Sequence, residues 1–229
     1  MKLREFDHEL DFSGNAPDFV RSTGLHMSDI YNSLYKQLDP DRYDKRDEDG
    51  DPEKMNWMKV AAGSVWERYF EPLLAAKYGG CRPGEFFTQH AVYCSAYQRP
   101  VKDGSVLCHC GAGVAFSPDW LFESPKLLLG EFKFTWYSSR NFPYEAEKFD
   151  KWLCQVMAYL YHLRMDTCWV FPYWVNGKYP GSKDKEGKWH PHPPTPDVTK
   201  AYELVFTPKE LWNNWAALLK HAWKEGMIP

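Results

Sequence analysis

Residues 113–135 read GVAFSPDWLFESPKLLLGEFKFT, and this stretch decides the fold. Its first part, Gly113–Asp119, predicts a β-strand that ends at an acidic residue. A segment of turn composition, Glu123–Lys126, comes next, and Leu127–Thr135 predicts a second strand that is largely buried. The order of these segments predicts a β-hairpin.

Three charged residues of the hairpin are expected to lie close together. Side chains alternate along a strand, so Glu131 and Lys133 share one face while Phe132 points to the other. The antiparallel return can bring Asp119 beside Glu131. An isolated E-x-K sequence is usually an exposed pair, but apolar residues flank this one, and unpaired charge in a buried element is costly. A functional role is a common reason for such charges.

Two carboxylates with a lysine suit a divalent metal that acts on phosphate. Mg²⁺ prefers oxygen ligands and keeps several waters, so Asp119, Glu131 and a substrate phosphate suffice to bind it. The metal makes a bound water a better nucleophile and neutralises charge that develops on phosphate oxygens. Lys133 can orient the same water or stabilise the same charge. The pattern therefore indicates a nuclease.

The sequence Pro118-Asp119 followed by Glu131-x-Lys133 resembles the signature of PD-(D/E)XK nucleases. Downstream, Gln155 and Tyr159 match the Q-x-x-x-Y motif of the RecB-like and λ-exonuclease-like branch of that superfamily. A helix predicted from Tyr144 to Leu163 carries both residues, and their spacing places them on one helical face. Each motif is short, so the resemblance depends on their joint occurrence in this order.

An upstream stretch resembles the first motif of the same branch. Residues 63–71 read GSVWERYFE, whereas many members have G-x-x-x-H-x-x-x-E, so Glu67 stands where those members have histidine. This exchange replaces an imidazole ligand with a carboxylate, which still suits Mg²⁺ or Mn²⁺. We expect Glu67 to be the nearer metal ligand, with Glu71 as a second candidate.

The resemblance implies a role for each site residue. The metal, Mg²⁺ or Mn²⁺, would be held by Glu67, Asp119, Glu131 and the backbone carbonyl of Phe132. Lys133 would assist the attacking water. Gln155 and Tyr159 would position that lysine or the scissile phosphate. Catalysis would then consist of positioning and charge stabilisation.

The resemblance also implies an α/β fold with a restriction-endonuclease-like core, in which a mixed central sheet is flanked by helices. The 229 residues, 44% of them hydrophobic, are enough for one well-filled domain. We expect a single domain over 1–229, with its core at about 57–175. An N-terminal helical extension would occupy 1–56, and a C-terminal strand and helix would occupy 200–225.

Local patterns predict several further elements. Ser28–Leu38 has the cap and apolar stripe of a short helix. Trp169–Val175 predicts a strand interrupted by Pro172, which suggests an edge position or a bulge. Tyr202–Phe206 predicts a final strand, and Thr207–Glu210 has the capping-box pattern of a terminal helix.

The six cysteines are expected to be reduced thiols of an intracellular protein, because the chain shows neither a membrane span nor a secretory signal. Some RecB-like nucleases hold an iron–sulfur cluster with three cysteines near the carboxyl end. No cysteine follows Cys168, so no such cluster is expected. A zinc site is the alternative for one group, although its ligand spacing is unfavourable: Cys94, Cys108, His109 and Cys110.

The net charge of −3 is unusual for a protein that attracts nucleic acid over long distances, so basic residues must be concentrated locally. The candidates near the core are Arg99, Lys102, Lys126, Arg140, Lys148, Lys151 and Arg164.

The resemblance favours an exonuclease of DNA recombination, repair or phage DNA processing, similar to stand-alone phage-encoded members. DNA would be its partner, with a second copy of the chain or a recombination or virion protein as further partners. Two alternatives remain open. One is a structure-specific endonuclease with the same core, and the other is a non-catalytic DNA-binding or virion-associated protein.

Overall fold

The computed structural model describes residues 1–7, 25–43, 52–87, 93–94, 99–100, 114–123, 127–135, 139, 142, 149–175, 181–191 and 200–228. The helices are α1 (Met27–Leu38), α2 (Pro40–Tyr43), α3 (Pro52–Tyr78), α4 (Asp150–Leu163) and α5 (Pro208–Lys224). The strands are β1 (Lys2–Asp7), β2 (Phe86–Phe87), β3 (Tyr93–Cys94), β4 (Arg99–Pro100), β5 (Ala115–Phe116), β6 (Trp120–Phe122), β7 (Leu128–Thr135), β8 (Thr167–Trp174), β9 (Gly181–Lys183), β10 (Trp189–Pro191) and β11 (Lys200–Val205).

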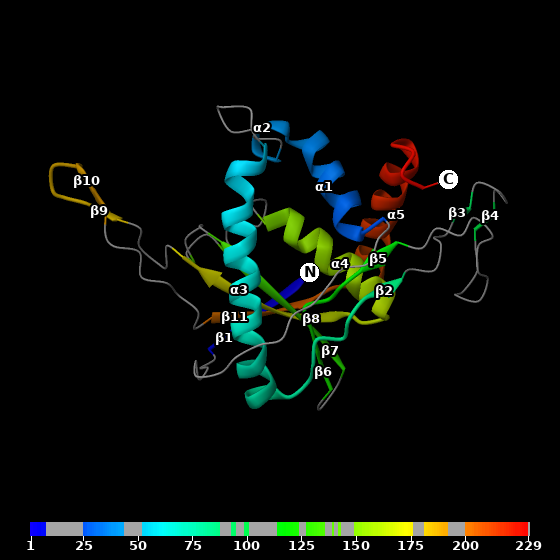
Figure 1. Ribbon diagram of the computed structural model, residues 1–229, viewed down its shortest axis with the longest axis horizontal. Coiled ribbons are helices and arrows are strands. Elements are labelled where there is room, and N and C mark those ends of the chain that lie inside the picture. The colour runs from blue at the N-terminus through cyan, green and yellow to red at the C-terminus, as the bar shows by residue number, and fades with distance from the viewer. Residues whose placement is uncertain are drawn as a thin grey trace.

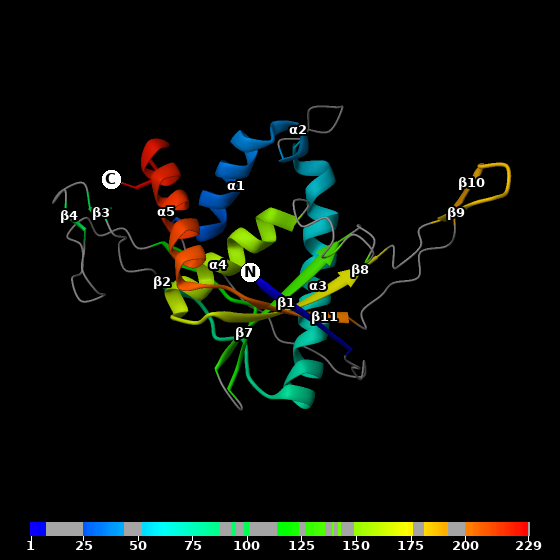
Figure 2. The same ribbon diagram turned by 180° about the vertical axis from the view of Figure 1, so that it is seen from behind.

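The centre of the molecule is a mixed five-stranded sheet with the order β1-β11-β8-β7-β6. Strands β7 and β8 are parallel, and the other neighbours are antiparallel. The sheet lies between α3 on one side and α4 with α1 and α5 on the other (Figure 1 and Figure 2). The predicted α/β class with a mixed sheet flanked by helices is therefore confirmed.

The two faces of β7 enter two different apolar cores. On the α3 side, Phe132 packs against Phe70 of α3, with 5.3 Å between ring centroids, and against Phe171 of β8. On the other side, Leu129 is fully buried in the core that α1, α4 and α5 share. Because side chains alternate along a strand, Glu131 and Lys133 lie on the same face as Leu129, beneath α4.

The predicted hairpin forms with a different first strand. Gly113–Asp119 was expected to pair with β7, but the pairing strand is β6, which begins directly after Asp119 and places Trp120 opposite Gly130. Ala115–Phe116 forms a separate short sheet with β2. Pro118 has no N–H for a sheet ladder, which explains why the chain leaves one sheet before it joins the other.

The strand that contains Pro172 lies inside the sheet, whereas the sequence suggested an edge position or a bulge. Strand β8 lies between β11 and β7. Its pairing with β11 runs only from Thr167 to Val170, while its pairing with β7 continues to Trp174. Pro172 therefore lies beyond the last β11 pair, where its missing N–H costs no bond to that strand.

The N-terminal segment is not only helical, as was expected for residues 1–56. Its first residues form β1, which pairs antiparallel with β11 and completes the sheet edge. Arg4 lies opposite Glu203, and its Nη2 donates to the Glu203 carboxylate at 3.1 Å. The sheet thus extends beyond the predicted core of 57–175 at both ends of the chain.

Two helix predictions are confirmed and one is corrected. Ser28–Leu38 lies within α1, but the helix begins at Met27 and its N-cap is His26, so the cap predicted at Ser28 is wrong. Helix α5 begins with the predicted capping box, in which Thr207 Oγ1 accepts from the Glu210 backbone N–H at 3.3 Å. Helix α4 was expected from Tyr144 but begins at Asp150, with Phe149 as its N-cap. Within the described ranges, no helix is both long and apolar enough to cross a membrane.

The structure describes only some of the cysteines and basic residues that the sequence singled out. Cys81, Cys154 and Cys168 are free thiols. The segment that carries Cys108, His109 and Cys110 lies outside the described residues, and of Cys94 only the strand position is described. Four of the basic candidates also lie outside the described residues: Lys102, Lys126, Arg140 and Lys148.

His162, at the end of α4, is largely buried against α5. Its ring meets Trp215 edge-on at 4.3 Å between centroids, and its Nε2 finds no hydrogen-bond partner among the described residues. Burial lowers the pKa of His162 to about 4. An unfolded chain has a histidine pKa of about 6.5, so it takes up the proton first as the pH falls. The stability that the neutral ring contributes is therefore complete above pH 6.5 and lost towards pH 4.

We expect His162→Phe to reduce this acid sensitivity. Between pH 7.5 and pH 5, the free energy of unfolding should fall by about 2 kcal/mol more in the wild type than in His162→Phe, which keeps an aromatic ring but cannot be protonated. Urea denaturation at both pH values measures the difference. The same loss in both proteins would show that protonation of His162 does not cause the loss of stability at acid pH.

Candidate functional site

The predicted catalytic residues meet where α4 lies over β7. Asp119, directly before β6, is held by the main chain of β7, because its Oδ2 accepts from the Phe132 N–H at 2.8 Å. This bond follows from the β6–β7 register, in which Trp120 lies opposite Gly130 and so places Asp119 next to Glu131. The hairpin thereby brings the two carboxylates together, as the sequence predicts.

A chain of hydrogen bonds connects β7 to α4. Lys133 Nζ donates to Glu131 Oε2 at 2.8 Å and to Gln155 Oε1 at 3.1 Å. Gln155 Nε2 in turn reaches the Tyr159 hydroxyl at 3.1 Å. Gln155 and Tyr159 share one face of α4 because they are one helical turn apart. The amide of Gln155 therefore fixes where the lysine ammonium lies.

Glu131 is completely buried and only half satisfied. Its Oε2 accepts from Lys133, but its Oε1 has no hydrogen-bond partner among the described residues. Burial and the neighbouring charge of Asp119 raise the pKa of Glu131 well above the ordinary carboxyl value. A buried acceptor without a partner is costly, and a cation beside Asp119 and Glu131 would remove that cost. This unpartnered oxygen is the feature that fits a metal ligand.

Lys133 remains charged in this environment. Burial alone would lower the pKa of its ammonium, but Glu131 and Asp119 outweigh that effect and raise it above the ordinary lysine value. A permanently charged Lys133 suits the stabilisation of negative charge on a phosphate oxygen and does not suit the abstraction of a proton.

Helix α3 contributes two carboxylates with different surroundings. Glu71 is buried and accepts from Arg82 Nε at 2.6 Å, and Arg82 Nη2 also contacts it. Glu67 is 3.4 Å from Arg82 Nη2. Burial raises the pKa of Glu67 to about 7, the charge of Asp119 adds to this, and Arg82 and Lys133 oppose it. The charges of Asp119 and Lys133 thus both affect the pKa of Glu67. The Glu71 carboxylate instead accepts hydrogen bonds from Arg82.

Arg82 is a site residue that the sequence did not reveal. It follows Cys81, whose N–H and carbonyl form a two-way bridge with Leu121 of β6 at 3.0 and 2.9 Å. This bridge places Arg82 over the carboxylates of α3. The pair Gly79-Gly80 was a sequence signal for the sharp turn that precedes Arg82, because consecutive glycines often follow the end of a helix. Both glycines have a positive φ in the structure.

Tyr31 of α1 is a second addition to the site. It is buried, and its hydroxyl is close enough to influence the pKa values of both Lys133 and Tyr159. The structure shows that packing brings α1 against α4 and so places Tyr31 at the site.

The metal site itself is only partly assembled from side chains. Within the described part of the chain, no three His, Cys, Asp or Glu side chains meet in a way that would hold a metal ion. Mg²⁺ requires only one or two carboxylates, because waters and substrate phosphates fill its remaining positions. Asp119 and Glu131 meet that requirement, while ligation by Glu67, Glu71 or the Phe132 carbonyl stays a prediction.

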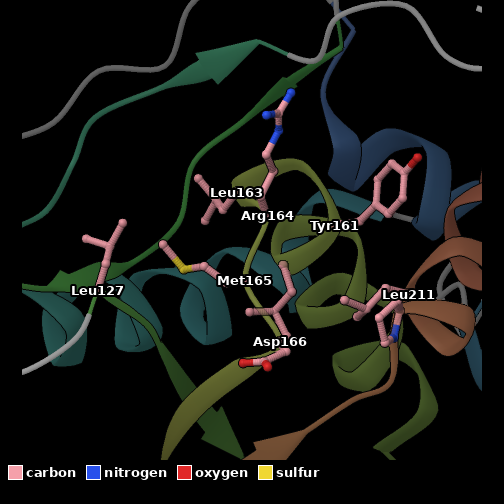
Figure 3. Close-up of a pocket in the computed structure, with 9 residues that line it drawn as sticks. Leu127, Tyr161, Leu163, Arg164, Met165, Asp166 and Leu211 are labelled. Atoms are coloured by element: carbon pink, nitrogen blue, oxygen red, sulfur yellow. The ribbon is translucent and has the colours of Figure 1, made fainter. Parts of the chain in front are cut away.

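A separate hollow of about 570 Å³ lies at the junction of α4 and α5 (Figure 3). Leu127, Leu163, Met165 and Leu211 give it apolar walls, and Arg164 extends away from its centre. None of the residues that line it belongs to the polar cluster around Glu131 and Lys133. The hollow is therefore distinct from the candidate site.

Comparison with known proteins leaves the family open. No protein-family model matches the chain, and no curated protein matches it. A solved structure described as "Crystal structure of SSO0001" is similar with a TM-score of 0.47 and 8% sequence identity, over 89% of this chain and 78% of that chain. Similarity at this level assigns neither a family nor an activity.

Proposed function

We propose that the protein is a Mg²⁺- or Mn²⁺-dependent DNA nuclease with a PD-(D/E)XK site on a restriction-endonuclease-like core. One observation carries the proposal: Glu131 is fully buried beside Asp119, one of its oxygens accepts from Lys133, and the other has no partner in the part of the chain that the structure describes. The order α3, β6, β7, α4, β8 agrees with what such a core requires. Buried charge of this kind is more common at functional sites than in structural cores.

The residues divide the work between binding and charge stabilisation. Asp119 and Glu131 would hold the cation, with Glu67 the nearer candidate on α3. The metal would supply Lewis-acid stabilisation of phosphate charge and lower the pKa of a bound water. Lys133, held by Gln155, would place a fixed positive charge at the reacting phosphate. Tyr159 would keep the Gln155 amide in the orientation that presents its oxygen to Lys133.

The preferred substrate is the end of a DNA strand, with action in recombination, repair or phage DNA processing inside a cell. The resemblance of the three motifs to the RecB-like branch supports this preference. Non-catalytic DNA binding is a second candidate, and a structure-specific endonuclease would use the same residues. An exonuclease and an endonuclease differ in one property, which is whether a DNA without ends is cut.

We expect linear DNA to be degraded in Mg²⁺ or Mn²⁺ and closed-circular DNA of the same sequence to remain intact, in both single- and double-stranded forms. Lys133→Ala should abolish the reaction because it removes the fixed charge at the phosphate. Gel analysis of matched substrates tests both expectations. Cleavage of circles would establish an endonuclease instead. An absence of metal-dependent cleavage of every substrate would exclude the nuclease and leave binding.

A further inference from the structure

Lys151, in the first turn of α4, is a partly buried cation in an aromatic setting. Its Nζ lies 5.9 Å from the ring centre of Tyr31 in α1 and 5.4 Å from that of Tyr43 in α2. The three helices therefore converge on this ammonium group. Rings at this distance attract a cation only weakly.

Lys151 pairs with no carboxylate among the described residues. Burial lowers the pKa of its ammonium, and the positive charge of Lys36 on α1 lowers it further. Lys151 is thus a positive charge without a counter-ion in the described part of a protein whose net charge is −3. A protein with a negative net charge needs such cations near its site in order to bind nucleic acid.

The position of Lys151 along α4 relates it to the candidate site. Lys151, Gln155 and Tyr159 follow one another at intervals of four residues, so they form one stripe along α4. Lys151 is one turn from Gln155, a rise of about 6 Å along the helix. That distance is comparable to the separation of neighbouring phosphates in a nucleic-acid strand. Tyr31 borders both places, since it influences Lys133 and lies under Lys151.

We propose that Lys151, held over the rings of Tyr31 and Tyr43, binds a backbone phosphate of the DNA strand next to the phosphate at Glu131 and Lys133. The inference rests on the proposed function for the identity of the second phosphate. Lys151 would contribute to strand binding and not to the chemical step. The site would orient the strand along the stripe of α4.

The test uses Lys151→Met, which keeps most of the aliphatic stem but removes the charge, and Lys151→Arg, which keeps the charge. Lys77→Met is the matched control, because Lys77 Nζ lies 5.2 Å from the ring centre of Tyr78 on α3 in a similar cation–aromatic contact. Binding of a fluorescent single-stranded oligonucleotide is measured without divalent metal, so that cleavage does not interfere. Thermal unfolding confirms that each variant is folded.

We expect Lys151→Met to weaken binding about tenfold, in line with the loss of one charged hydrogen bond. The slope of log affinity against log salt should decrease by about 0.7, the contribution of one phosphate on a single strand. Lys151→Arg and Lys77→Met should behave like the wild type. A single uncharged methylphosphonate at the contacted position should weaken the wild type but not Lys151→Met.

Wild-type affinity and salt slope in Lys151→Met would overturn the phosphate site, as would methylphosphonate effects that are the same in both proteins. A failure of the oligonucleotide to bind the wild type would overturn it as well. Because binding is measured without hydrolysis, these outcomes are independent of the cleavage assay. A protein that binds through Lys151 but never cleaves would retain this site and lose the proposed nuclease activity.

Discussion

Replacing Glu131 with glutamine should reduce metal-dependent DNA hydrolysis by about 10³-fold and weaken Mg²⁺ binding to the free protein. The amide has the size of the carboxylate but carries no charge, and its nitrogen cannot be a metal ligand. It would occupy the position of an oxygen that lacks a partner among the described residues. Calorimetric titration with Mg²⁺ and single-turnover cleavage of linear DNA measure the two effects separately.

Glu123→Gln is the control for this experiment. Glu123 follows β6, is exposed, and lies on the same hairpin as Glu131. Its replacement also exchanges one carboxyl group for an amide and should leave both Mg²⁺ binding and hydrolysis unchanged. Undiminished Mg²⁺ affinity in Glu131→Gln would remove Glu131 from the ligand set, and undiminished hydrolysis would remove it from the mechanism.

Gly80→Ala should destabilise the protein by about 3 kcal/mol or more. Gly80 has a φ of +95°, a backbone conformation that residues other than glycine rarely adopt. A Cβ at this position would lie 2.2 Å from the Leu121 carbonyl oxygen and 2.7 Å from Trp120 Nε1. The carbonyl belongs to the bridge that holds Cys81, so the main chain must shift and Arg82 must move with it.

Gly79→Ala separates the steric contribution from the conformational one. Gly79 also has a positive φ, of +71°, but a Cβ there would have no neighbour within 4 Å. Its replacement should cost only about 1 kcal/mol, the strain of the left-handed conformation. Urea denaturation of both variants gives the difference. Equal losses would show that the chain around Gly80 relaxes without cost and that the bridge to β6 does not hold Arg82 in place.

The parts of the site that are close in sequence could be predicted from spacing alone. Alternation along a strand placed Glu131 and Lys133 on one face, and the helical period placed Gln155 above Tyr159. The hairpin brought Asp119 to Glu131 even though the pairing strand starts after Asp119 and does not end at it. The catalytic and metal-binding roles of these residues stay predictions.

Contacts between distant segments could not be predicted in this way. Arg82 reaches the α3 carboxylates through a bridge to β6, and Tyr31 reaches Lys133 because α1 packs on α4. Neither contact leaves a periodic signal in the chain. Pro172 was misjudged because the sequence does not show that β11 stops pairing at Val170. The mixed charges of β1 concealed a strand, as is common at sheet edges.

The pairing of β1 with β11 also has a consequence for the order of folding. Lys2 lies opposite Val205, so one edge of the central sheet forms only after residue 205 has been synthesised. Closing so long a loop costs entropy before the strand bonds form, which slows folding. During synthesis β11 would dock late on β8, and β1 would dock on β11 last of all. Until β11 docks, the edge of β8 would stay exposed to association with other chains.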